Sequence, residues 1–153
     1  MVRLASIPEP MRGHMEKLPC PTFENTPFVK APPAGERRVA IISTAGLHRR
    51  DDRPFGLGSN DYRVIPGEIK ANDLVMSHVS TNFDRTGFQQ DLNVLFPLDR
   101  LREMAKRGET GSVADYHYSF MGATEPEKME AAARNQASLM KDDGVNVVLL
   151  VPV

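Results

Sequence analysis

The sequence predicts an α/β domain with a mainly parallel sheet whose strands are joined by crossover helices. Short apolar runs rich in valine, isoleucine and leucine recur along the chain, which is typical of strands buried on both faces of a parallel sheet. Segments with apolar residues at helical spacing alternate with the later runs. That alternation favours right-handed crossovers between neighbouring parallel strands.

The first half of the domain is predicted to consist of short extended segments joined by polar loops. Residues 39–42 form a β-branched apolar run that ends in small residues, and residues 62–65 are expected to form a short extended piece that stops at Pro66. Residues 73–78 are predicted as a second buried strand of the sheet. Polar loops are expected on either side of it, at residues 47–61 and 79–93.

Two helices follow, separated by a third strand within residues 113–120. Residues 98–107 place apolar side chains at helical spacing, and Gly108 suits the C-terminal cap. The second helix is expected to begin at Thr124, in a capping box with Glu127, and to end at Gly144. The last strand is predicted at residues 145–151.

This last strand is the most apolar segment of the chain. A strand of that kind needs cover on both faces, and a helix after Val153 would supply it. The fold class is therefore predicted as half of a flavodoxin-like or Rossmann-like fold, incomplete at the C-terminus. Two alternatives to a missing helix are equally good. The last strand is a natural edge strand, or the N-terminal arm covers its exposed face.

Residues 1–36 are predicted to form a proline-rich arm, and residues 37–153 the α/β domain. Seven prolines interrupt regular structure in the arm, leaving room for a short helix between Pro10 and Leu18. The single cysteine, Cys20, is interpreted as a bystander because no helix start or cationic neighbour favours its thiolate.

The composition limits the functions that the chain can have. Its 153 residues, 41% hydrophobic and 25% charged, suit one domain with its own core. The formal net charge of -1 creates no field that would recruit nucleic acid or an anionic membrane. Without a signal peptide or a run of about 20 apolar residues, the protein is predicted to be cytoplasmic and to bind neither nucleic acid nor membranes.

Three histidines follow the predicted strands, at the edge where open α/β sheets bind ligands. His48 is a candidate general acid, since histidine exchanges a proton near neutral pH; alternatively it pairs with Asp51 or Asp52. His78 is expected either to orient a substrate or to be a satisfied core residue. His117 is a catalytic candidate with a structural alternative, because it lies within its strand.

Four residues are predicted to bind substrate: Arg50, Asp84, Arg85 and Ser119. A guanidinium group matches a carboxylate in shape, so Arg50 is a candidate for that role. Asp84 is expected either to bind an amine or to form an ion-pair cluster with Arg85 and Asp91. Ser119 stands at the end of the third strand.

No metal site or nucleotide site is predicted. His48, His78 and Asp84 lack the tight spacing of metal ligands. Gly56 and Gly58 do not lead into a helix, so they do not form a dinucleotide fingerprint.

Five motifs occur in a fixed order: Thr44–His48 with Arg50–Asp52, Tyr62–Gly67, Asp73–His78, Phe96–Leu101 and Phe120–Gly122. Together they resemble the glycine, sarcosine, betaine and D-proline reductase selenoprotein B family. The resemblance covers about residues 38–153 and is closest to the D-proline-reductase-type subunit and its small relatives. Residues 82–88 are typical of the small relatives, which leaves the substrate open.

The resemblance implies a reductase subunit that cleaves a carbon–nitrogen bond in an amino acid or related amine. It implies a selenocysteine or cysteine immediately after Val153 and a second cysteine three residues on. We therefore expect that the reading frame closes at a recoded UGA and that the chain without its selenocysteine is inactive. A pyruvoyl or other carbonyl group is expected on a partner subunit, in a homo-oligomer or hetero-oligomer.

Two other functions stay open from the sequence. One is a general thiol or selenol redox protein without a dedicated amine substrate. The other is a non-catalytic binding or scaffold domain that ends naturally at Val153.

Overall fold

The computed structural model describes residues 3–18, 21–22, 24–80 and 85–153. Its main sheet is built around β1 (Arg38–Ser43). On one edge of β1 lie β5 (Ser112–Val113) and β6 (Tyr116–Ser119), and on the other lies β7 (Val147–Val151). All three run parallel to β1, while β3 (Arg63–Pro66) completes the sheet antiparallel to β6. The predicted α/β fold with a mainly parallel sheet is confirmed.

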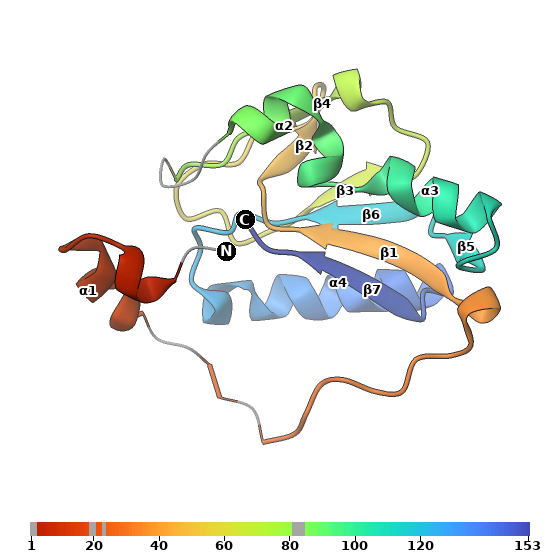
Figure 1. Cartoon of the computed structure of the whole chain (residues 1–153), viewed down its shortest axis with the longest axis horizontal. Coiled ribbons are helices and arrows are strands. Elements are labelled where there is room, and N and C mark those ends of the chain that lie inside the picture. The colour runs from red at the N-terminus through yellow and green to blue at the C-terminus, as the bar shows by residue number, and fades with distance from the viewer. Residues whose placement is uncertain (1–2, 19–20, 23, 81–84) are drawn as a thin grey trace.

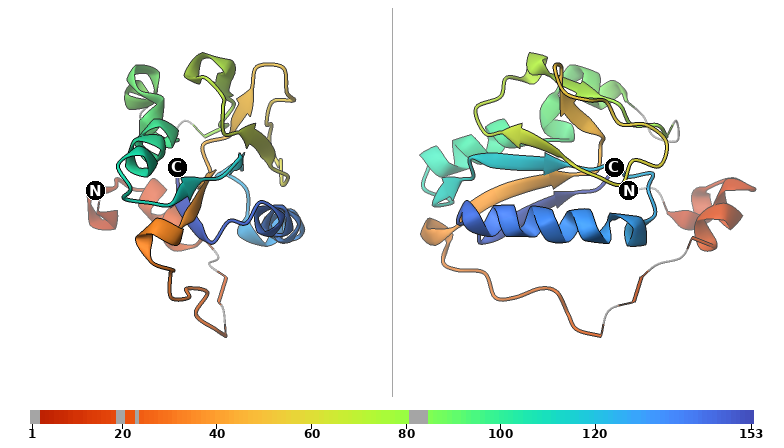
Figure 2. Two further views of the ribbon diagram at one scale, coloured as in Figure 1. Left: turned by 90° about the vertical axis from the view of Figure 1, so that its right-hand side faces the viewer. Right: turned by 180° about the vertical axis from the view of Figure 1, so that it is seen from behind.

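One helix covers each face of this sheet, as the end-on view of Figure 2 shows. The first is α3 (Leu98–Lys106), preceded by η4 (Leu92–Val94) and α2 (Thr86–Gln90). The second is α4 (Glu130–Asp142), which continues from η5 (Pro126–Met129). The main apolar core lies on the α3 side, where Ile41, Phe96 and Leu101 pack together. Burial of such side chains stabilises the fold by about 1.5–3 kcal/mol each.

The predicted strand at residues 73–78 does not belong to the parallel sheet. Its centre, β4 (Leu74–Met76), follows η3 (Ala71–Asp73) and pairs antiparallel with β2 (Leu47–Arg49) in a separate two-stranded sheet. The expected loop at 47–61 therefore begins with a strand. Its side chains still join the apolar core, where Leu74 is buried and Met76 packs against the cluster.

The predicted capping box at Thr124 is also wrong. The hydroxyl of Thr124 donates a hydrogen bond to the carbonyl oxygen of Ser59, 2.6 Å away. Glu125 precedes η5 without capping it. Glu125 rather than Thr124 stands at the N-cap position, one residue later than the motif predicts. The predicted end of the second helix at Gly144 is confirmed, with φ at 68°.

The N-terminal part carries η1 (Leu4–Ser6), α1 (Met11–Glu16) and η2 (Ala34–Glu36). Figure 1 shows α1 lying apart from the sheet, and α1 has no buried residue. Cys20 lies outside the described residues. No helix within the described ranges is long and apolar enough to cross a bilayer.

Strand β7 lies at the edge of the sheet in Figure 1. Among the described residues it pairs with β1 alone. Its side chains Val148, Leu149 and Leu150 are exposed, Leu150 to 61%. The predicted last strand thus exists, and it presents apolar surface on both faces.

Candidate functional site

The carboxyl ends of β1 and β7 are tied together by Thr44. Its backbone N–H donates to the carbonyl oxygen of Val151 at 3.1 Å. Its hydroxyl accepts a hydrogen bond from the N–H of Val153 at 2.8 Å and donates to the carbonyl oxygen of the same residue at 3.3 Å. The end of β7 is therefore held in one position beside β1.

Two glycines allow other segments to approach this edge. Gly46 has φ at 63°, a conformation that favours glycine, and a Cβ there would lie 3.1 Å from the backbone nitrogen of His78. Its carbonyl oxygen accepts a hydrogen bond from the N–H of Ser77 at 2.9 Å. A Cβ on Gly122 would lie 2.7 Å from the carbonyl oxygen of Val153. The edge thus gathers Ser77, His78 and Val153.

His48 and Ser77 form a hydrogen-bonded pair across β2 and β4. The Nε2 atom of His48 lies 2.6 Å from the hydroxyl of Ser77, and its Nδ1 lies 2.6 Å from the carbonyl oxygen of Arg49. A carbonyl only accepts, so Nδ1 carries the proton and Nε2 accepts from the hydroxyl of Ser77. The ring is buried at 5% exposure, which fixes its orientation toward the serine.

His78 is buried next to this pair. Its Nδ1 accepts a hydrogen bond from the N–H of Ser80 at 3.1 Å. Burial, and secondarily the charge of Arg85, lower the pKa of His78 from its usual value, so the ring is neutral at neutral pH. The guanidinium of Arg85 donates to the carbonyl oxygens of His78 and Ser80, at 2.8 and 2.6 Å. Arg85 therefore holds the backbone of His78 and Ser80.

His117 lies inside the sheet, fully buried. Its Nδ1 accepts a hydrogen bond from the backbone N–H of Ile41 at 3.0 Å, which replaces a ladder bond between β1 and β6. Its ring meets Phe96 edge-on at 5.6 Å between centroids. Burial lowers the pKa of His117 to about 4. These contacts are structural, and the predicted catalytic role stays a prediction.

The other predicted substrate-binding residues have different surroundings. Ser119 is fully buried, and its hydroxyl accepts a hydrogen bond from the N–H of Leu47 at 2.8 Å. Arg50 donates to the carbonyl oxygen of Asn72 at 2.9 Å and lines a separate hollow with Glu68. Asp84 lies outside the described residues. The structure therefore brings together His48, His78 and Arg85 and leaves Arg50 apart.

Sequence reasoning missed Thr44 and Ser77 as site residues. Both are hydroxyl residues placed directly after an apolar run, and that position was the available signal. No cluster of three metal-ligating side chains occurs in the part of the chain that the structure describes.

Residues 60–153 match the family model of glycine/sarcosine/betaine reductase selenoprotein B. The chain belongs to this family. The resemblance inferred from the five motifs is thus confirmed. The part of this selenoprotein B-family chain that matches includes Ser77, His78 and Gly122, while Thr44 and His48 precede it.

Three curated relatives are similar to this selenoprotein B-family chain. The D-proline reductase subunit gamma of Acetoanaerobium sticklandii is 36% identical over 115 residues, covering 73% of this chain and 47% of the relative. Two proteins of Peptoclostridium acidaminophilum follow. The sarcosine reductase complex component B subunit beta is 27% identical, covering 86% of this chain and 32% of the relative. The betaine reductase complex component B subunit beta is 30% identical, covering 73% of this chain and 27% of the relative.

The chain spans less than half the length of these relatives. All three are subunits of reductases or of reductase complexes. No solved structure matches the chain significantly.

Proposed function

We propose that this chain is part of a reductase that cleaves a carbon–nitrogen bond in a small amino acid or related amine. The observation that carries the proposal is the His48–Ser77 pair at the sheet edge where Thr44 holds the end of β7. The two are linked through Gly46, two residues after Thr44, whose carbonyl oxygen accepts from the N–H of Ser77. The relatives support the reaction class, because their names are those of D-proline, sarcosine and betaine reductase subunits.

The nucleophile of this reaction is proposed to lie just beyond Val153. A selenol or thiol there would attack the carbon that carries the amine, so that a carbon–selenium or carbon–sulfur bond forms while the carbon–nitrogen bond breaks and its electron pair leaves on the nitrogen. A carbonyl group on a partner subunit would activate that nitrogen. A second thiol would then attack the selenium or sulfur, release the carbon with a proton and leave a selenylsulfide or disulfide, which an external dithiol reduces. The surroundings of Val153 fit such a group. Thr44 holds both backbone polar groups of Val153, and Gly122 brings backbone rather than a side chain against it. Residues attached at this point would start from a fixed position, which favours a preorganised reaction geometry.

His48 and Ser77 are proposed to deliver the proton that the departing amine needs. In the protonated state, the Nε2 of His48 would donate to the oxygen of Ser77, while the hydroxyl proton of Ser77 passes to the amine nitrogen. The carbonyl oxygen of Arg49, 2.6 Å from Nδ1, holds the ring in the required orientation. Such proton transfer contributes about 10²–10⁴-fold to a rate.

His78 is proposed to contact the substrate as a neutral ring. Its lowered pKa keeps it uncharged, so it does not repel a cationic amine. Because Nδ1 accepts from the N–H of Ser80, the ring carries its proton on Nε2 and would donate from there. Arg85 then acts indirectly by holding the loop that carries His78.

We further propose that the chain works in a hetero-oligomer in the cytoplasm, with a carbonyl-bearing partner.

The proposed function is tested by an assay of the reductase assembled with the residues encoded beyond Val153 and with its partner subunit, using dithiothreitol as reductant. Glycine, D-proline, sarcosine and betaine are offered separately, and reduced products are measured by mass spectrometry. Cleavage of one of them is expected. Reduction of disulfides without cleavage of any amine would instead indicate a general redox protein.

A further inference from the structure

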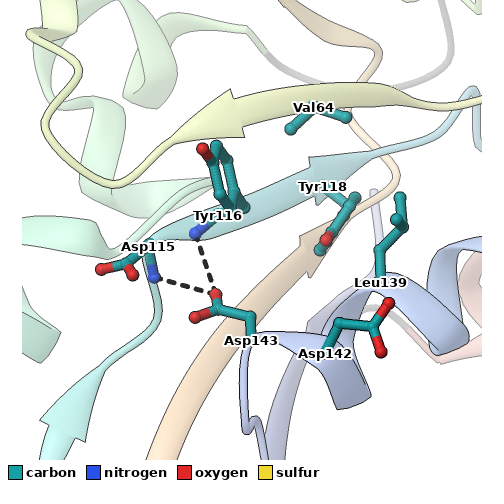
Figure 3. A pocket seen from close by; sticks show the side chains of 7 residues that line it. All are labelled: Val64, Asp115, Tyr116, Tyr118, Leu139, Asp142 and Asp143. Atoms are coloured by element: carbon teal, nitrogen blue, oxygen red, sulfur yellow. Dashed lines mark hydrogen bonds between the residues drawn. The ribbon is translucent and has the colours of Figure 1, made fainter.

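A second pocket lies between β3, β6 and the C-terminal end of α4 (Figure 3). It measures about 450 Å³, and its lining includes Val64, Tyr116, Tyr118 and Leu139 together with three aspartates. It shares no lining residue with the edge described above. Tyr116 stands at the amino end of β6, whereas the candidate functional site lies beyond the carboxyl end of the same sheet.

Tyr118 is a buried residue whose side chain lines this pocket. The residue is 1% exposed, and Figure 3 shows its ring lying along the pocket beside Leu139. Among the hydrogen bonds of the described residues, none involves its hydroxyl. Burial, followed by the nearby Asp143, raises the pKa of Tyr118 to about 12, so the group stays a neutral hydroxyl. The hydroxyl has no partner among these residues, so it is available to an occupant of the pocket.

The pocket carries excess negative charge. Asp143 is already engaged: it pairs with Arg38 and accepts from the N–H groups of Asp115 and Tyr116, at 3.0 and 3.2 Å (Figure 3). Asp115 lies 3.1 Å from the same Arg38 guanidinium. The carboxylate of Asp142 has no ion-pair or hydrogen-bond partner within the described residues. Two carboxylates therefore share one guanidinium and a third, that of Asp142, is left without a counter-charge, which favours a cationic occupant.

The remaining walls are apolar or aromatic. Val64 and Leu139 line the pocket, and the ring of Tyr116 is 49% exposed. An aromatic face attracts a cation, and aliphatic walls suit a hydrocarbon stem. The aspartates form no metal-binding cluster in the described part of the chain. These features favour an organic cation over a metal ion.

We propose that this pocket binds an ammonium or guanidinium group carried on a short aliphatic stem. Its walls would contact the stem, Asp142 would pair with the charge, and the hydroxyl of Tyr118 would accept a hydrogen bond from it. The cation comes either from a free alkylamine or from a lysine or arginine side chain of a partner polypeptide. This site goes beyond the proposed reductase function and does not depend on it.

The test is a titration of the isotope-labelled chain followed by NMR shifts of backbone amides. Pentylamine and the blocked peptide Gly-Lys-Gly are the probes; pentanol and the same peptide with acetylated lysine are the uncharged controls. Both charged probes are expected to shift Tyr116 and Asp142. Each variant removes one polar contact to the charged group, so Tyr118→Phe and Asp142→Asn should each weaken binding about tenfold. Glu109→Gln, at an exposed carboxylate paired with Arg107, should leave it unchanged.

The relative affinity of the two charged probes distinguishes a free amine from a side chain of a partner polypeptide. Tighter binding of the peptide supports a partner side chain, and tighter binding of pentylamine supports a free amine. The proposal is overturned if neither charged probe shifts these amides, if pentanol binds equally well, or if both variants bind like the unmodified chain. None of these results depends on reductase activity.

Discussion

The hydroxyl of Thr44 bonds to both backbone polar groups of Val153, accepting from its N–H at 2.8 Å and donating to its carbonyl oxygen at 3.3 Å. One side chain at the end of β1 thus fixes the end of β7. The proposed nucleophile position depends on this contact, since it sets where the chain goes after the strand.

Replacing Thr44 with valine should loosen this end without unfolding the domain. Valine keeps the shape and loses both hydrogen bonds, each contributing about 0.5–1.5 kcal/mol. Amide hydrogen exchange at Val153 should accelerate about tenfold. The control is Thr110→Val, which removes a bond to the carbonyl oxygen of Arg37 at the other end of the sheet and should leave Val153 unchanged. Equal exchange at Val153 in all three proteins would contradict the role given to Thr44.

Gly122→Ala should displace the same segment by crowding. The added Cβ would lie 2.7 Å from the carbonyl oxygen of Val153 and 2.9 Å from that of Thr44, and both are backbone atoms that cannot rotate away. Crowding of this kind costs about 1–3 kcal/mol, measured by denaturant unfolding. Gly56→Ala is the control, because nothing lies within 4 Å of its added Cβ. Equal stability of the two variants would show that the approach at Gly122 is not tight.

His117 should make the domain less stable in mild acid. Its folded-state pKa of about 4 lies below the value of about 6.5 for an unfolded histidine. As the pH falls from 6.5 toward 4, the unfolded chain takes up a proton that the folded chain does not. The free energy of unfolding should therefore drop by about 2 kcal/mol between pH 7 and 4.5 from this residue alone.

The variant His117→Asn isolates this contribution. Its side-chain oxygen can still accept from the N–H of Ile41, but it does not titrate, so the loss of stability over this pH range should shrink by that amount. His14→Asn, at an exposed histidine in α1, should keep the original slope. An unchanged slope in His117→Asn would mean that the buried ring is protonated as easily as a free one.

The apolar surface of β7 should bind a hydrophobic dye. Val148 and Leu150 alternate with Leu149, so they share one face of the strand, and all three are exposed. Leu150→Lys should reduce the fluorescence of bound anilinonaphthalene sulfonate. Leu57→Lys changes a leucine that is more exposed but isolated in a loop, and it should have little effect. If both variants reduce the signal equally, the dye does not report on β7.

The elements that the sequence predicts well are those decided by local pattern. The run at 39–42 became β1, and the helical spacing of Leu98 and Leu101 became α3. The pairing of β2 with β4 was missed because three-residue strands carry too few alternations to reveal a partner. The cap at Thr124 failed because Glu125 occupies the N-cap position, while the hydroxyl of Thr124 donates to the carbonyl oxygen of Ser59.

The candidate site was predicted only in part, for a similar reason. Strand ends can be located from the sequence, so His48 and His78 could be assigned to one edge. The partner of His48 could not, because Ser77 reaches it through the unforeseen β2–β4 pairing. His117 looked like a residue of the same edge, but the break between β5 and β6 turns its ring to the N–H of Ile41.

The most direct test of the central claim is the rate of carbon–nitrogen bond cleavage, followed as reduced product, by the assembled reductase carrying Ser77→Ala. Loss of the hydroxyl breaks the proposed proton path from His48, so the rate should fall at least tenfold while the substrate affinity and the free energy of unfolding change little. Ser112→Ala, in β5 at the other end of the sheet, should retain the full rate. An undiminished rate in Ser77→Ala would contradict the assignment of the reaction to this edge.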